Sequence, residues 1–170
     1  MVAIDGRGGA GKSTLAAMVA QRVGAFVIDG DDFYRHENWT EFSEAERAEL
    51  CIDWRSQLDV LEAILNKRPA RWQPYDWESD NGQLSREWSV CQPGYRVVIL
   101  EGTFSARPQL HDLLRLKVLL TVSRSQQRER FIEREGGDEW DAWAATWMGA
   151  EDVYFRHVMP PEAFDLTIRT

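Results

Sequence analysis

Short apolar runs alternate with helix-favouring stretches along most of this chain. The strand-like runs occupy residues 2–5, 26–29, 96–100, 118–122 and 165–169. Such an alternation is typical of a parallel sheet that carries helices on both of its faces. The pattern therefore predicts an α/β fold, a three-layer α/β/α sandwich around a five-stranded parallel sheet, which we expect residues 1–170 to form as one domain.

The interval between the second and third runs is too long for a simple crossover. Residues 43–46 carry a capping pattern, and residues 54–67 place leucines on one side of a second amphipathic helix. Two aromatic-rich segments then flank Asn81-Gly82, which is a strong hairpin-turn signal. We expect residues 36–95 to form a helical-plus-hairpin insertion that binds a substrate.

Composition narrows the range of partners. The chain of 170 residues has 20 Lys and Arg against 28 Asp and Glu, a net charge of -8, which argues against a nucleic-acid surface. It contains no apolar span long enough for a membrane helix, no signal peptide, and two cysteines without metal-like spacing. We expect a cytoplasmic monomer or homodimer with no nucleic-acid or membrane partner. Because the chain begins almost at the first strand, the sequence leaves open whether residues precede Met1.

The first apolar run leads into a phosphate-binding pattern. Residues 6–13, Gly-Arg-Gly-Gly-Ala-Gly-Lys-Ser, satisfy G-x-x-x-x-G-K-[ST] and are followed by a helical stretch. In this pattern the backbone cradles a polyphosphate, Lys12 reaches the β and γ phosphates, and Ser13 holds Mg²⁺. The alternative is a glycine-rich turn, but the strand–loop–helix context favours a P-loop NTPase that uses ATP and Mg²⁺. The candidate nucleotide-binding residues are Gly8, Gly9, Ala10, Gly11, Lys12, Ser13 and Thr14.

Acidic side chains follow the next two strands at the points where these strands end. Asp29, Asp31 and Asp32 come after the second run, and Glu101 follows the third. Since ligands bind beyond the carboxyl ends of parallel strands, these groups converge on the phosphate site. Asp31 or Asp32 could accept a proton from a substrate hydroxyl, and Glu101 could hold the metal together with Ser13. The sequence therefore predicts phosphoryl transfer, although spacing alone does not choose between the two aspartates.

Tryptophan is concentrated in the insertion. Five of the eight tryptophans lie there, at positions 39, 54, 72, 77 and 88. Aromatic walls suit a flat substrate, and the alternative is that each ring packs the hairpin onto the sheet.

Several segments together resemble the uridine kinase-like branch of P-loop kinases, and the resemblance extends over most of the chain. They are residues 6–16, Asp31-Asp32-Phe33-Tyr34-Arg35, Pro74-Tyr75-Asp76-Trp77, Ile99-Leu100-Glu101-Gly102 and the closing segment 154–168. The resemblance implies that Asp31 is the catalytic carboxylate and that Glu101 belongs to the metal site. It also implies that Tyr34, Tyr75 and the neighbouring Trp77 bind the phosphoryl acceptor, a small hydroxylated metabolite.

The acceptor itself stays open. Uridine kinases carry a base-contacting histidine shortly after the tyrosine segment, whereas Trp77 is followed here by Glu78-Ser79-Asp80. The wider family also phosphorylates pantothenate, ribulose phosphate, other sugars and sugar acids, so any of these types fits. A phosphorylated acceptor would need basic groups, for which Arg35, Arg71 and Arg86 are available. A second class of function is a regulatory ATPase module that has no small-molecule acceptor.

Four arginines between residues 124 and 134 resemble the helix of the family's lid, which closes over ATP. Helical geometry puts Arg124 and Arg128 on one face and Arg130 and Arg134 on another. Arg128 and Arg134 best match the family pattern, so we expect both to bind ATP and Arg128 to take part in catalysis, within a lid region at about residues 124–140. The alternative is an exposed helix laced with ion pairs. Arg107 could touch a substrate anion, or merely precede a helix that begins at Pro108.

Overall fold

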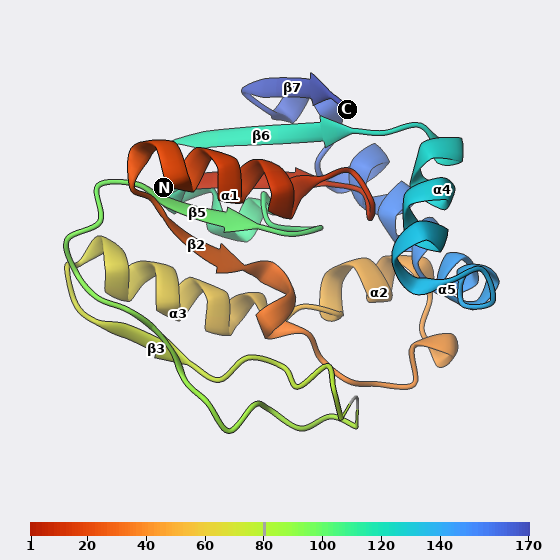
Figure 1. Ribbon diagram of the computed structural model, residues 1–170, viewed down its shortest axis with the longest axis horizontal. Helices are drawn as coiled ribbons and strands as arrows, with labels where there is room; N and C mark the ends of the chain where they lie inside the picture. The colour runs from red at the N-terminus through yellow and green to blue at the C-terminus, as the bar shows by residue number, and fades with distance from the viewer. Residues whose placement is uncertain (80) are drawn as a thin grey trace.

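The sheet has five parallel strands in the computed structural model, which describes residues 1–79 and 81–170 (Figure 1). The strand order is β2-β5-β1-β6-β7, and every neighbouring pair is parallel. The α/β fold with a five-stranded parallel sheet is therefore confirmed. The strands are β1 (Val2–Gly6), β2 (Phe26–Asp29), β5 (Val98–Glu101), β6 (Leu116–Thr121) and β7 (Leu166–Arg169).

Helices cover both faces of this sheet, because its strands are apolar on both sides. On β6, Val118 and Leu120 belong to the hydrophobic cluster under α1, whereas Leu119 belongs to the larger cluster on the opposite face. That larger cluster also takes in α2, α3 and the end of α5. The helices are α1 (Lys12–Val23), α2 (Glu44–Leu50), α3 (Trp54–Leu65), α4 (Arg124–Glu135) and α5 (Trp140–Val153). In the described part of the chain, none of them is long and apolar enough to cross a membrane.

Short helical turns and a small hairpin complete the chain. The hairpin pairs β3 (Ala70–Trp72) with β4 (Ser89–Cys91) in antiparallel register. Beyond β3 the Tyr75 N–H bonds to Asp32 O at 2.8 Å, and the two arms of the hairpin meet again where Tyr75 pairs with Leu84. A 3-10 turn spans Gly30–Phe33, and further turns lie at Trp39–Glu41, Pro108–Leu113, Tyr154–Val158 and Pro161–Ala163.

A buried carboxylate ties the carboxyl edge of the sheet together. Asp5, at the end of β1, accepts hydrogen bonds from the N–H groups of Gly6 (2.7 Å), Phe104 (3.0 Å) and Ala106 (2.8 Å). The hydroxyl of Tyr154, which follows α5, donates to the same carboxylate at 2.8 Å. The phosphate loop, the segment after β5 and the end of α5 are thereby fixed to one side chain.

Arg107 is a structural residue rather than a contact for a substrate anion. Its side chain is buried and donates to the carbonyl oxygens of Ala48 (2.9 Å), Glu49 (3.2 Å) and Phe104 (3.3 Å). Two backbone acceptors at the end of α2 and one in the segment after β5 thus take up the guanidinium. The alternative reading, in which Arg107 precedes a helix at Pro108, is the one that the structure bears out.

Candidate active site

The phosphate loop presents unpaired amide groups at the start of α1. Gly9 and Gly11 have φ angles of 72° and 87°, values that glycine adopts without strain. The Ala10 N–H bonds to Arg7 O at 3.1 Å. Among the described residues, the amide N–H groups of Gly9, Gly11, Lys12, Ser13 and Thr14 have no hydrogen-bond partner. Converging free donors at a helix N-terminus form an anion-binding nest.

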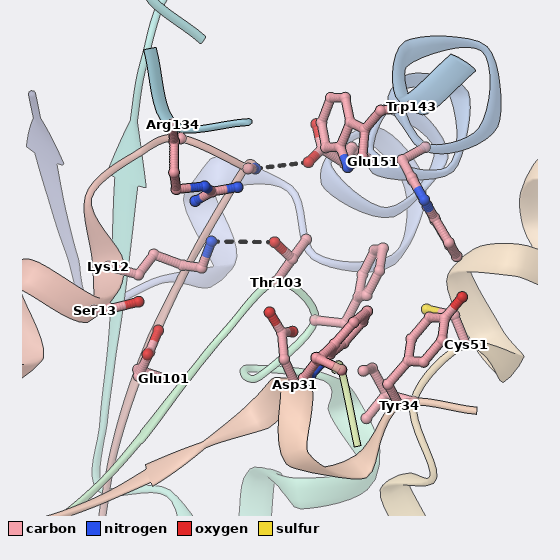
Figure 2. A pocket seen from close by; sticks show the side chains of 16 residues that line it. Lys12, Ser13, Asp31, Tyr34, Cys51, Glu101, Thr103, Arg134, Trp143 and Glu151 are labelled. Carbon is pink, nitrogen blue, oxygen red and sulfur yellow. Dashed lines mark hydrogen bonds between the residues drawn. The ribbon is translucent and has the colours of Figure 1, made fainter. Parts of the chain in front are cut away.

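The Lys12 ammonium group lies over this loop. Its Nζ donates to Arg7 O and to Thr103 Oγ1, each at 3.2 Å, and the second bond is drawn in Figure 2. Thr103 in turn donates its hydroxyl proton to Gly6 O at 3.0 Å. Two oxygen acceptors therefore hold the cation at the mouth of the nest.

Ser13 and Glu101 lie side by side, as the sequence predicts for a metal site. Glu101 ends β5 between β1 and β2 and is 3% exposed, and the Ser13 hydroxyl lies near its carboxylate (Figure 2). Burial and the nearby Asp29 raise the pKa of Glu101 to about 7. No cluster of three or more His, Cys, Asp and Glu side chains in the described residues could cage a metal ion. One hydroxyl and one carboxylate nevertheless fit Mg²⁺, which commonly takes its remaining ligands from phosphates and water.

The carboxylates of the two neighbouring aspartates, Asp31 and Asp32, point in different directions. Asp32 accepts a hydrogen bond from Trp72 Nε1 at 2.7 Å, which turns its carboxylate toward the hairpin. Asp31 instead faces the cavity beside the phosphate loop (Figure 2). Desolvation by the surrounding protein is the largest cause that raises the pKa of Asp31 to about 6, and the negative charge of Asp29 is the second. The Asp31 side chain is nevertheless in contact with solvent. Of the two aspartates, Asp31 is thus the one whose carboxylate faces the cavity.

A cavity of about 250 Å³ joins these groups to an aromatic wall. At one end lie the loop, Lys12, Ser13, Glu101 and Thr103, and Arg134 reaches in from the end of α4. The other end is lined mainly by aromatic and apolar side chains, namely Tyr34, Cys51, Ile52, Trp77, Phe104 and Trp147, while the Trp143 ring lies against Gly8 of the loop. The cavity therefore has one end with charged groups that suit a phosphate and an adjoining end that suits a less polar molecule.

Most of the predicted site residues meet in this cavity, but not all. The lining includes Gly8, Gly9, Lys12, Ser13, Asp31, Tyr34, Trp77, Glu101 and Arg134. Ala10 is buried within the loop and Thr14 faces outward. Tyr75 lies behind the wall: it is 4% exposed, packs edge-on against Tyr34 with ring centroids 4.9 Å apart, and its hydroxyl is 2.9 Å from His36 Nδ1. Asp80 lies outside the described residues.

Arg128 is not brought to the site. It is exposed on α4 and is not among the described residues that line the cavity. The helix instead turns Arg130 toward the loop, where it donates to Gly9 O at 2.9 Å, and brings Arg134 to the cavity lining with its side chain still 65% exposed. Successive helical residues are about 100° apart, so a face that carries positions 130 and 134 leaves position 128 pointing away. The expectation that Arg128 and Arg134 both bind ATP stays a prediction, and of the two only Arg134 is among the described residues that line the cavity.

Sequence reasoning missed the wall that α5 provides. Trp143, Trp147 and Glu151 are spaced four residues apart on one helix face, and all three line the cavity. Of the five tryptophans of the insertion, only Trp77 lines this cavity, whereas Trp39 and Trp72 are core residues. The spacing of four was a visible signal, but it is equally typical of a helix that packs on a core.

Comparison with protein families and with curated proteins gives one short match. No family model matches the chain. One curated protein, a bifunctional pantoate ligase/cytidylate kinase from Gloeobacter violaceus, is 50% identical over 44 residues, which are 26% of this chain and 8% of that protein's length. A match of this extent leaves most of both proteins unaligned.

Solved structures match over nearly the whole chain. A "putative fructose transport system kinase" from Silicibacter sp. TM1040 has a TM-score of 0.74 at 22% identity and covers 98% of this chain and 88% of its own. A "possible uridine kinase" from Bacillus stearothermophilus also has a TM-score of 0.74, at 21% identity, with 98% and 86% covered. D-glycerate 3-kinase from Cryptococcus neoformans has a TM-score of 0.57 at 16% identity, with 88% and 76% covered. At such identities the likeness concerns the fold, and the chain has the fold of uridine kinase-like P-loop kinases.

Proposed function

We propose that this protein is an ATP- and Mg²⁺-dependent kinase that transfers the γ-phosphoryl group to a hydroxyl of a small metabolite. The observation that carries the proposal is that Lys12 and Asp31 face one cavity, which continues to an aromatic wall. Phosphoryl transfer needs a cradle for the donor, positive charge near the moving group and an acceptor-side base. The kinase fold of the solved structures supports the same conclusion.

The residues divide between the two substrates. The free amide groups of the loop and the Lys12 ammonium would bind the phosphates of ATP, and Arg134 would add positive charge from α4. Ser13 and Glu101 would hold Mg²⁺, which supplies charge neutralisation at the phosphate oxygens. Asp31 would accept the proton of the acceptor hydroxyl as its oxygen bonds to the γ-phosphorus. The bond from that phosphorus to the bridging oxygen breaks, and ADP leaves with the electron pair.

The basic side chains that a phosphorylated acceptor would need lie elsewhere. Arg35 forms an exposed pair with Glu37 at 3.2 Å, and the Arg71 guanidinium stacks 3.9 Å from the centre of the Trp88 ring. Neither residue is among those that line the cavity, and Arg86 is likewise outside that set. These positions support an unphosphorylated acceptor that contacts Tyr34, Trp77 and Trp147.

A screen for acceptor-dependent ADP release tests the proposal. The purified chain, with ATP and Mg²⁺, is offered nucleosides, pantothenate, sugars and sugar acids, and Asp31→Asn is the matched control. At least one acceptor should stimulate ADP release above the control. If every acceptor leaves wild type at the Asp31→Asn rate, the kinase proposal fails.

A further inference from the structure

Glu151 of α5 is buried against the phosphate loop, although no phosphate-binding pattern includes it. The residue is 2% exposed. Its Oε1 accepts the Gly8 N–H at 2.7 Å, the contact drawn in Figure 2, and its Oε2 accepts from Gln127 Nε2 of α4 at 3.0 Å. One carboxylate therefore connects the loop, α4 and α5.

Two arginines balance the charge of this carboxylate. Arg7 of the loop approaches Glu151 Oε2 at 3.5 Å, and Arg124 of α4 approaches it at 3.8 Å. Both guanidinium groups also pair with the neighbouring Asp152, which is only partly buried. Since these arginines have two carboxylates between them, Asp152 would still hold them if Glu151 lost its charge.

Some amide groups of the loop are paired within the protein and the others are free. Gly8 donates to Glu151 and Ala10 donates to Arg7 O, while the N–H groups of Gly9, Gly11, Lys12, Ser13 and Thr14 are unpaired within the described residues. The Trp143 ring also packs tightly against the loop at Gly8. A Cβ atom added to Gly8 would lie only 2.8 Å from Cζ2 of this ring. The loop is thus held on its α5 side while its free donors face the cavity.

We propose that Glu151 is a positioning residue that preorganises the phosphate loop for ATP and makes ATP binding depend on how α4 and α5 pack. The inference rests on the proposed function only in taking ATP as the ligand of the loop. A loop held in its binding geometry does not have to be ordered when the phosphate arrives, so affinity is gained. The opposing effect is repulsion between the carboxylate and the phosphates, which would weaken ATP binding.

Two substitutions separate these effects. Glu151→Gln removes the charge but keeps an oxygen that can accept the Gly8 N–H, whereas Glu151→Ala removes both. Asp152→Asn is the matched control, because it weakens the same two arginine contacts from the next position of the helix but removes no hydrogen bond to a backbone N–H of the loop. ATP affinity is measured by calorimetry without acceptor, in EDTA and again with Mg²⁺, and the melting temperature of each variant is recorded.

We expect Glu151→Ala to weaken ATP binding by about tenfold or more and Glu151→Gln by less than about threefold, with Asp152→Asn close to wild type. Once an acceptor is known, its KM should change less than the KM for ATP. Tighter ATP binding in both Glu151 variants would overturn the inference, since the carboxylate would then repel the phosphates. Unchanged binding in Glu151→Ala would also overturn it.

Glu151→Ala could fail to fold, and Glu151→Gln then decides the matter. A folded Gln variant that loses tenfold or more in ATP affinity contradicts a role through the Gly8 bond, because that bond is retained. Wild-type protein that binds ATP no better than Lys12→Ala would instead overturn the proposed function. Wild-type binding together with an unaffected Glu151→Ala overturns this inference alone.

Discussion

Thr103 Oγ1 accepts a hydrogen bond from the Lys12 ammonium at 3.2 Å while it donates its own proton to Gly6 O at 3.0 Å. Because the hydroxyl proton is used on the backbone, a lone pair of the oxygen is directed at the ammonium. The Arg7 carbonyl takes a second proton of the same group. The remaining N–H of the Lys12 ammonium group is then free to donate to a phosphate oxygen. Thr103 thus helps to orient this ammonium group.

Thr103→Val should therefore lower kcat by about tenfold, because it keeps the shape of the side chain but removes the oxygen that positions Lys12. Thr103→Ser retains that oxygen and is expected to stay near wild type. Steady-state kinetics with ATP varied at saturating acceptor checks both variants. Equal loss of activity in the Val and Ser variants would point to packing of the methyl group instead.

Activity should fall on the acid side with an apparent pKa near 6. The pKa of Asp31 is raised from 3.8 to about 6, and a general base works only when it is deprotonated. At saturating Mg²⁺, which keeps the Glu101 carboxylate ionised, kcat/KM should be level above that pKa, and below it kcat/KM should drop by about tenfold per pH unit. The pH profile of kcat/KM for the acceptor measures this limb. An acid limb near pH 4 would show that Asp31 has an ordinary pKa or that another group is the base.

The two ATP-binding arginines proposed from sequence should behave differently. Arg134 lines the cavity, so Arg134→Ala removes positive charge near the phosphates and should lower kcat/KM for ATP by about tenfold or more. Arg128 is exposed and outside the cavity lining, and Arg128→Ala should stay within about twofold of wild type. Kinetics of the two variants, measured side by side, checks the assignment. A large loss for Arg128→Ala would show that the lid rearranges when ATP binds.

The hairpin offers a matched pair of tryptophans for testing the acceptor end. Trp77 is 53% exposed and lines the cavity with Asp31, whereas Trp88 is 48% exposed and stacks under Arg71. Trp77→Ala should raise the acceptor KM by about tenfold and leave the ATP KM nearly unchanged. Trp88→Ala should change neither. If both variants raise the acceptor KM equally, the hairpin acts through its stability and not through direct contact.

Much of the donor side could be predicted from sequence because its determinants are local. Eight consecutive residues specify the phosphate loop, and the apolar runs specify the strands that present Asp31 and Glu101 at one edge. The choice between Asp31 and Asp32 needed the structure, since the deciding contact is made by Trp72, which is 40 residues away.

The features of the site that the sequence did not predict depend on contacts between distant segments. Gly8 and Glu151 are 143 residues apart, and no pattern in the sequence near either residue predicts their hydrogen bond. The helical spacing of the α4 arginines was correct, but the sequence does not say which face of the helix meets the loop. That orientation follows from burial of Gln127 and Phe131, which turns Arg134 toward the cavity and leaves Arg128 outside.

Asp5 and Tyr154 should contribute to the stability of the fold rather than to catalysis. Tyr154→Phe removes one of the four donors to the buried Asp5 carboxylate and leaves three backbone N–H groups in place. We expect it to lower the free energy of unfolding by about 1–2 kcal/mol, the usual value of one such bond. Asp5→Ala leaves all of these donors without their acceptor and should cost about 3–5 kcal/mol. Urea unfolding of the three proteins measures the difference, and a Phe variant as unstable as the Ala variant would show that Asp5 depends on Tyr154 more than on the backbone.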